Sequence, residues 1–172
     1  MASGLLGALA GALTVMTSDR ADVRGLAPGL VIWGCALVAA ASCDAVTQRI
    51  PTPLIRQATV VTCALLVGGL SVHADWRGLV LSGVGSAAAT VSLLLCWRFA
   101  GAGFGDVRLA ALGGLGLGHA THEGLLLGLV AFGAMTGVQA GVALARGGTR
   151  RTLIPYGPAL AAGFLIAATC RP

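Results

Sequence analysis

Residues 101–109, with the sequence GAGFGDVRL, place three alternating glycines and one carboxylate in a chain that is otherwise almost continuously apolar. An ionisable side chain at or near membrane depth is costly unless it faces protein or water, so Asp106 is a candidate functional residue. The glycines strengthen this interpretation, because a backbone without Cβ atoms can bend or let another chain approach closely. Asp106 therefore needs a partner group elsewhere in the sequence.

The best candidate partner is Asp44. The chain has only six acidic residues, and among them only Asp44 stands at the end of a long apolar run. The residues Arg49-Ile50-Pro51 follow soon after it and indicate the end of the helix, since proline disfavours helix at the residue before it. Asp44 is therefore expected in the last turns of a helix.

The composition identifies the class of protein. Of the 172 residues, 56% are hydrophobic and only 10% are charged, too few to cover an apolar surface in water. The sequence predicts an all-α, polytopic membrane helix bundle that forms one integral-membrane domain over residues 1–172. The eleven basic residues, all arginine, are scattered without stacking aromatics, so the expected partner is the lipid bilayer and not nucleic acid.

Apolar runs predict six or seven transmembrane helices. The expected spans are residues 4–17, 26–44, 58–72, 78–97, 107–118, 124–145 and 154–169. The first is expected to be a retained span, because Met1-Ala2-Ser3 lacks the basic side chains of a signal peptide. The fifth is short and interrupted by glycine, so neighbouring helices are expected to shield it.

Small and polar residues inside the spans predict helix packing. We expect Gln139 to make an interhelical hydrogen bond. Glycines at four-residue spacing favour close approach of helices in lipid, and they are Gly7 and Gly11, Gly114 and Gly118, and Gly133, Gly137 and Gly141.

The distribution of arginine predicts the orientation. If the spans alternate, seven arginines lie on one side of the membrane (Arg49, Arg56, Arg98, Arg108, Arg146, Arg150 and Arg151) and four on the other (Arg20, Arg24, Arg77 and Arg171). By the positive-inside rule the first side is cytoplasmic. Asp44 and Asp106 both belong to that side, so they can meet at the cytoplasmic face of a cell membrane.

Two facing carboxyl groups in a partly desolvated site cannot both ionise easily, so one keeps a proton near neutral pH. The ionised member can then accept a proton from an attacking water, while the protonated member donates to the developing oxyanion or the leaving amine. This chemistry is that of an aspartyl protease. It requires no cofactor, and the five cysteines form no CxxC pair of the kind that would indicate a metal site.

Three blocks of this sequence resemble the signatures of the type IV prepilin leader peptidases, a family of GxGD intramembrane aspartyl proteases. They are Asp44 with Arg49-Ile50-Pro51, Gly103-Phe104-Gly105-Asp106 with Val107-Arg108-Leu109, and Ile154-Pro155-Tyr156-Gly157-Pro158. The blocks stand in the family's order and span the chain from about residue 40 to its end.

The resemblance implies catalytic roles for Asp44 and Asp106 and a substrate that is a prepilin or pseudopilin. It implies that the enzyme removes the basic leader at the cytoplasmic membrane face. The residues expected to line the substrate site are Pro51, Gly103, Gly105, Pro155, Gly157 and Pro158. The sequence has no counterpart of the inserted segment with two CxxC pairs that larger members carry, so we expect the peptidase without the methyltransferase activity.

Two positions differ from the usual family pattern. Thr52 stands where the family usually has asparagine, and Arg108 where it usually has lysine. Threonine keeps a hydroxyl and arginine keeps the charge, so both changes are mild.

Other interpretations of these residues are open at this stage. Asp106 can be a helix cap, and Asp44 an interfacial residue paired with Arg49. Together the aspartates can also serve a small proton-coupled transporter, or belong to a non-catalytic subunit of a pilus or secretion assembly. His119, His122 and Glu123 are expected to form a solvated polar turn on the far side from the aspartates.

Overall fold

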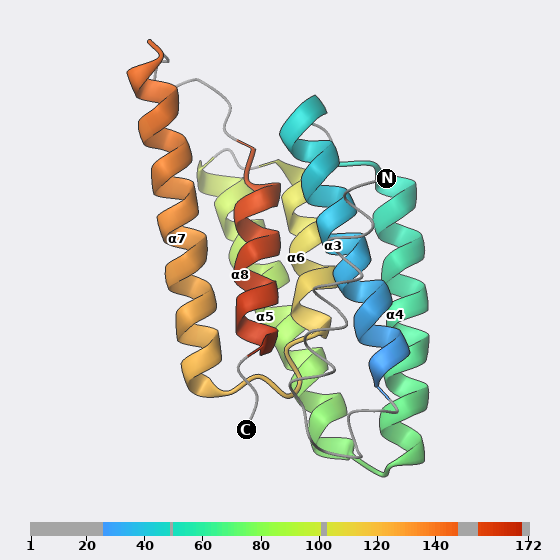
Figure 1. The fold of residues 1–172 in the computed structure, drawn as a ribbon. Helices are drawn as coiled ribbons and strands as arrows, with labels where there is room; N and C mark the ends of the chain where they lie inside the picture. Colours follow the sequence, from blue (N-terminus) through green and yellow to red (C-terminus); the bar gives the residue numbers. More distant parts are fainter. Residues whose placement is uncertain (1–25, 49, 101–102, 148–154, 170–172) are drawn as a thin grey trace.

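A computed structural model describes residues 26–48, 50–100, 103–147 and 155–169, and these residues form an all-helical bundle (Figure 1). The expected first span and the link that follows it lie outside the described residues. The helices in the described part are α3 (Ala27–Thr47), α4 (Thr52–Val72), α5 (Trp76–Ala100), α6 (Phe104–Leu115), α7 (His122–Ala145) and α8 (Gly157–Thr169). Four of them, α3, α4, α5 and α7, are long and apolar enough to cross a membrane.

The break between α3 and α4 follows from local sequence. Gln48 adopts a left-handed backbone with φ of 51° and donates its amide to the carbonyl of Asp44, which ends α3. Pro51 then caps α4 in an extended conformation, as expected for a residue with a fixed φ and no amide proton. Asp44 consequently lies in the last turns of α3.

Successive helices run in opposite directions, so the carboxyl terminus of each helix and the amino terminus of the next lie at the same end of the bundle (Figure 1). One end contains the carboxyl termini of α3, α5 and α7 and the amino termini of α4, α6 and α8. Asp44 and Asp106 both lie there, and we call it the aspartate end. Asp75 and His119 lie at the opposite end.

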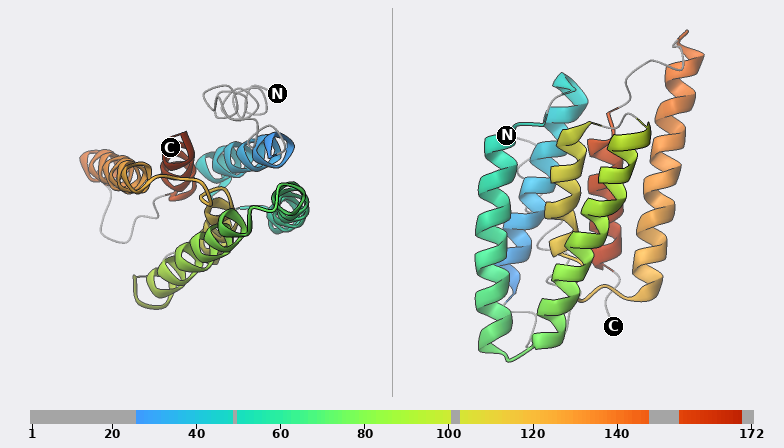
Figure 2. Two further views of the ribbon diagram at one scale, coloured as in Figure 1. Left: turned by 90° about the horizontal axis from the view of Figure 1, so that it is seen from below. Right: turned by 180° about the vertical axis from the view of Figure 1, so that it is seen from behind.

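Helix α6 occupies the centre of the bundle and packs against α3, α4, α5 and α8 (Figure 2). Leu109, Ala110 and Leu112 are fully buried in it. Its 12 residues extend for only about 18 Å, too short for a hydrocarbon core of about 30 Å. The expected fifth span is thus a core helix, shielded on its sides by longer neighbours.

Two side-chain bonds from neighbouring helices fix α6. The buried ring of Trp33 in α3 donates through Nε1 to the carbonyl of Leu112 at 2.9 Å. Ser86 of α5 donates through Oγ to the carbonyl of Ala111 at 2.8 Å. The Leu112 carbonyl is among the last four of α6, which lack intrahelical partners, so the indole satisfies a group that would otherwise be buried unpaired.

Glycines allow the closest helix contacts. A Cβ atom built on Gly114 of α6 would lie 2.5 Å from the carbonyl oxygen of Gly85 in α5, so only glycine permits this approach. Gly128 of α7 meets the backbone of Gly163 in α8 in the same way. The predicted packing role of Gly114 is therefore confirmed, as is that of Gly118, which contacts α5.

Two packing predictions for α7 are not borne out within the described residues. Among the described residues, nothing lies where a Cβ of Gly133, Gly137 or Gly141 would be, because α7 is at the edge of the described bundle and uses a different face against α8. The side-chain oxygen of Gln139 is buried without a hydrogen-bond partner in the described part of the chain.

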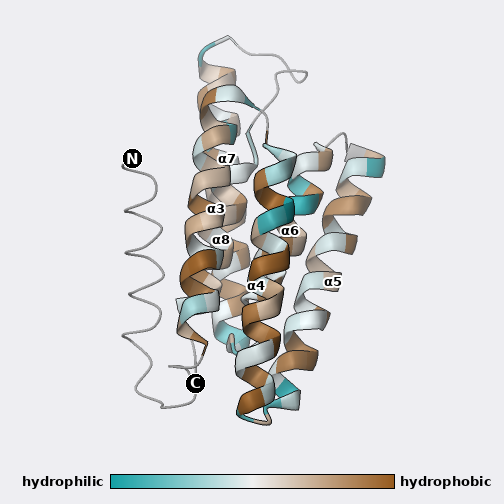
Figure 3. Ribbon diagram, turned by 90° about the vertical axis from the view of Figure 1, so that its right-hand side faces the viewer, coloured by the Kyte–Doolittle hydropathy of each residue, from teal (hydrophilic) through white to brown (hydrophobic). Residues whose placement is uncertain are grey.

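The outer surface is apolar. Large side chains such as Leu129, Val130 and Val138 of α7 are about two-thirds exposed, and α5 is similarly uncovered. Figure 3 shows hydrophobic residues along the helices, with hydrophilic residues mainly toward the two ends of the bundle. A surface of this kind is suited to lipid and not to water.

Candidate active site

Asp44 lies on α3 and is 6% exposed. Its Oδ2 accepts a hydrogen bond of 2.9 Å from the backbone amide of Gly157, the first residue of α8. The first amides of a helix have no intrahelical acceptor, so the start of α8 provides a free donor for a carboxylate. The third sequence motif is therefore bound directly to the aspartate of the first.

Only glycine fits at position 157. A Cβ atom there would lie 2.7 Å from Asp44 Oδ2 and 2.8 Å from Asp44 Cβ. The absence of a side chain thus allows the α8 backbone to reach the carboxyl group.

Asp106 is in the first turn of α6 and is also 6% exposed. Its Oδ2 accepts a hydrogen bond of 3.2 Å from the amide of Gly103, at the start of the helix. The N-cap of α6 is therefore Gly103 and not Asp106, which corrects the N-cap interpretation; the Asp106 carboxyl group accepts from the N-cap amide as in a capping box. This hydrogen bond does not exclude a second role for Asp106, because Asp44 is buried at the same end of the bundle.

The linker between α3 and α4 lies against α6 beside these aspartates. A Cβ atom on Gly105 would lie 3.2 Å from Cβ of Ile50, so glycine lets the linker approach closely. Pro51 follows Ile50 and fixes the start of α4. Arg49, the expected partner of Asp44 in the interfacial interpretation, lies outside the described residues.

The structure gathers the predicted site residues at the aspartate end. Gly103 and Gly105 begin α6, and Gly157 and Pro158 begin α8, with half-buried Pro155 just before it. Ile154 lies outside the described residues. Segments separated by as many as 113 residues in the sequence thus meet around two buried carboxyl groups.

One contact near this site was not predicted from the sequence. Arg108 Nη1 donates to Thr52 Oγ1 at 2.6 Å. These are the two positions that differ from the family pattern, and the structure places them against one another. The sequence alone does not indicate this contact, because the two residues are 56 positions apart in it.

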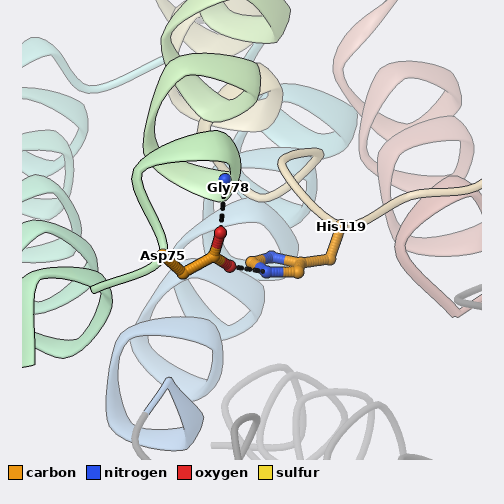
Figure 4. A network of polar contacts seen from close by, with 3 residues as sticks. All are labelled: Asp75, Gly78 and His119. Atoms are coloured by element: carbon orange, nitrogen blue, oxygen red, sulfur yellow. Dashed lines mark hydrogen bonds and ion pairs between the residues drawn. The ribbon is translucent and has the colours of Figure 1, made fainter. Parts of the chain in front are cut away.

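The opposite end of the bundle has its own polar pair (Figure 4). His119 Nε2 lies 2.7 Å from Asp75 Oδ2, and the amide of Gly78 donates to Asp75 Oδ1 at 2.9 Å. These hydrogen bonds hold the pKa of Asp75 below its ordinary value of 3.8, the bond from Gly78 contributing most. The turn is polar and solvated as expected, with His122 and Glu123 exposed, but His119 is paired in it and joins the α6–α7 turn to the start of α5.

No metal centre is formed by the described residues, since three His, Cys, Asp or Glu side chains nowhere come together in them. His119 and Asp75 lack a third ligand there.

Comparisons of the chain with protein-family models, with curated proteins and with solved structures found no match. The resemblance to prepilin peptidases rests on the residues of the three motifs.

Proposed function

We propose that this chain is an intramembrane aspartyl endopeptidase that removes the leader peptide of type IV prepilins or pseudopilins. The observation that supports it most is the convergence of the three motifs: Asp44, Asp106 and Gly157 belong to the ends of α3, α6 and α8 that lie at one end of the bundle, and Gly157 donates to Asp44. A helix cap alone would not require a second buried carboxyl group beside it.

The proposed reaction uses the two carboxyl groups as base and acid. The ionised one accepts a proton from water as the water oxygen attacks the scissile carbonyl carbon. The protonated one donates its proton to the carbonyl oxygen. Attack and protonation together give a tetrahedral intermediate. When the intermediate collapses, the C–N bond breaks, and the carboxyl group that accepted the water proton gives it to the leaving amine. A hydroxyl proton of the intermediate passes to the other carboxylate as the new carbonyl group forms. The pair is then singly protonated, as it was before the reaction.

The arginines support a cytoplasmic active site. Of those in the described residues, Arg56, Arg98, Arg108 and Arg146 lie at the aspartate end, and only Arg77 lies at the other. Positive residues collect on the cytoplasmic side of membrane proteins. Leaders that begin in the cytoplasm would therefore reach the aspartates without crossing the bilayer.

The direct test is co-expression with candidate prepilins, followed by a gel that separates the precursor from the shorter mature protein. The wild-type chain should remove the leader, and Asp106→Asn should not. Glu123→Gln is the matched control, because it makes the same chemical change in α7 at the opposite end of the bundle. Cleavage by purified Asp106→Asn at near wild-type rate would exclude this catalytic pair and favour the transporter or structural-subunit functions.

A further inference from the structure

The beginning of α6 is attached to α4 by one short side-chain hydrogen bond. Arg108 is two residues after Asp106, and its Nη1 donates to Oγ1 of Thr52, the first residue of α4, at 2.6 Å. The bond therefore joins the helix that contains Asp106 to the segment that follows Asp44.

The guanidinium of Arg108 also stacks on an aromatic ring. Its central carbon lies 4.9 Å from the centre of the Phe104 ring. Phe104 in turn meets Trp97 of α5 edge-on, with 5.5 Å between ring centres. A planar guanidinium can stack and donate at the same time, so Arg108 is fixed although it is exposed.

Three contacts of the described residues connect the segment that follows Asp44 with itself and with α6. The carbonyl of Asp44 accepts the amide of Gln48 at 2.9 Å, which fixes the start of the linker. Ile50 packs against Gly105, and Thr52, the first residue of α4, accepts from Arg108. Ile50 and the first residue of α4 therefore contact α6 on both sides of Asp106 in the sequence.

The first turn of α6 is also held by the hydrogen bond between Gly103 and Asp106 and by the contact of Gly105 with Ile50. Gly103 and Phe104 are exposed, and the capping residue Gly103 has no side chain with which to hold the helix start. We propose that Arg108 and Thr52 form a positioning pair that keeps Asp106 in register with Asp44. This inference rests on the proposed peptidase function.

The expected consequence is a loss of turnover with little change in substrate binding. A misplacement of about 1 Å can reduce catalysis by up to about 10²-fold, while the residues that contact substrate stay in place. Thr52→Val keeps the shape of the side chain but removes the acceptor, and Arg108→Met keeps the stem but removes the donors. Each should lower kcat by about tenfold with KM nearly unchanged.

Kinetics on the purified full-length chain, with a prepilin that it cleaves, would test the pair. The double variant should be no worse than the poorer single variant, because the two residues act through one bond. Thr52→Ser, which retains the hydroxyl, should restore kcat. In Thr52→Val the acidic and basic limbs of the pH profile of kcat should also shift to other pH values, because the mutual repulsion of the two carboxyl groups depends on the distance between them. A change that only reduced the folded fraction would leave those limbs in place.

Arg56→Met is the matched control, because it removes the same charge one turn further along α4. Its kcat should equal that of the wild type. Wild-type kcat in Thr52→Val, or equal losses in Arg56→Met and Arg108→Met, would overturn the positioning role.

Hydrogen exchange measured by mass spectrometry separates this inference from the proposed function. Amides of α6 near Asp106 should exchange faster in Thr52→Val than in Thr52→Ser, whether or not the chain is a peptidase. Unchanged exchange would overturn the inference. Failure of the wild type to cleave any prepilin, together with faster exchange in Thr52→Val, would reject the peptidase function and leave the structural part of the inference supported.

Discussion

The backbone amide of Gly157 donates to Asp44 Oδ2 at 2.9 Å, across 113 residues of sequence. This bond makes the start of α8 part of the candidate active site. It also explains why position 157 requires glycine, since a Cβ atom would lie 2.7 Å from the accepting oxygen.

Gly157→Ala should therefore lower the rate of leader cleavage by about 10²-fold, because either Asp44 or α8 must move to relieve the clash. Initial rates with purified protein would measure the loss. Gly133→Ala provides the control, since its Cβ would meet open space within the described residues and activity should be retained. Equal rates for Gly157→Ala and the wild type would contradict the site geometry.

Asn substitutions should show that the aspartates act together. Asp44→Asn and Asp106→Asn each preserve side-chain shape but remove proton exchange, so either should abolish cleavage while the protein still folds and inserts. The double variant should be no worse than either single one, because residues that act as a unit are non-additive. Single-turnover assays can measure such low rates. Independent, additive losses would mean that the carboxyl groups do not form one site.

The orientation can be tested by cysteine labelling in a cysteine-free background. Val46→Cys lies in the last turn of α3, at the aspartate end, and is 84% exposed in the native structure. An impermeant thiol reagent should label it only from the cytoplasmic side. His73→Cys, at the end of α4, should be labelled only from the opposite side. The reverse pattern would place the aspartates outside the cell.

The Asp75–His119 pair should make stability depend on pH in acid. Because the pKa of Asp75 is lowered in the folded state, its stabilising contribution is present above the ordinary value of 3.8 and is lost as pH falls through the folded-state pKa. Asp75→Asn should therefore lower the melting temperature in detergent at about pH 5, and the difference from wild type should shrink toward about pH 2. Glu123→Gln, in the first turn of α7, is the control for loss of a carboxylate at this end. A difference that stays constant over this range would contradict the assigned role.

Much of the helical arrangement was predictable because apolar runs and prolines are local signals. Pro51 marked the break after α3, and the alternation of spans placed Asp44 and Asp106 at one end of the bundle. The number of spans was harder to predict, since α6 is apolar but too short to cross alone. Hydropathy cannot distinguish a helix surrounded by lipid from one surrounded by protein.

The contacts between side chains were less predictable. His119 was assigned to a solvated turn because its partner, Asp75, is 44 residues away and belongs to another loop. Arg108 and Thr52 were each interpretable alone, but their bond depends on how α4 packs against α6. The glycines of α7 matched a packing pattern, yet the pattern does not indicate which face of a helix has a neighbour.

The shortness of α6 has a consequence for biosynthesis. A 12-residue helix with a carboxyl group in its first turn is a poor candidate for independent insertion into a bilayer, so it depends on neighbours made both before and after it. One of those neighbours is α8, the last of the described helices to leave the ribosome, and it also brings the amide of Gly157 to Asp44. The two-aspartate centre is thus completed only after α8 has been translated, and a nascent chain that ends before residue 157 should contain both carboxyl groups without an assembled site.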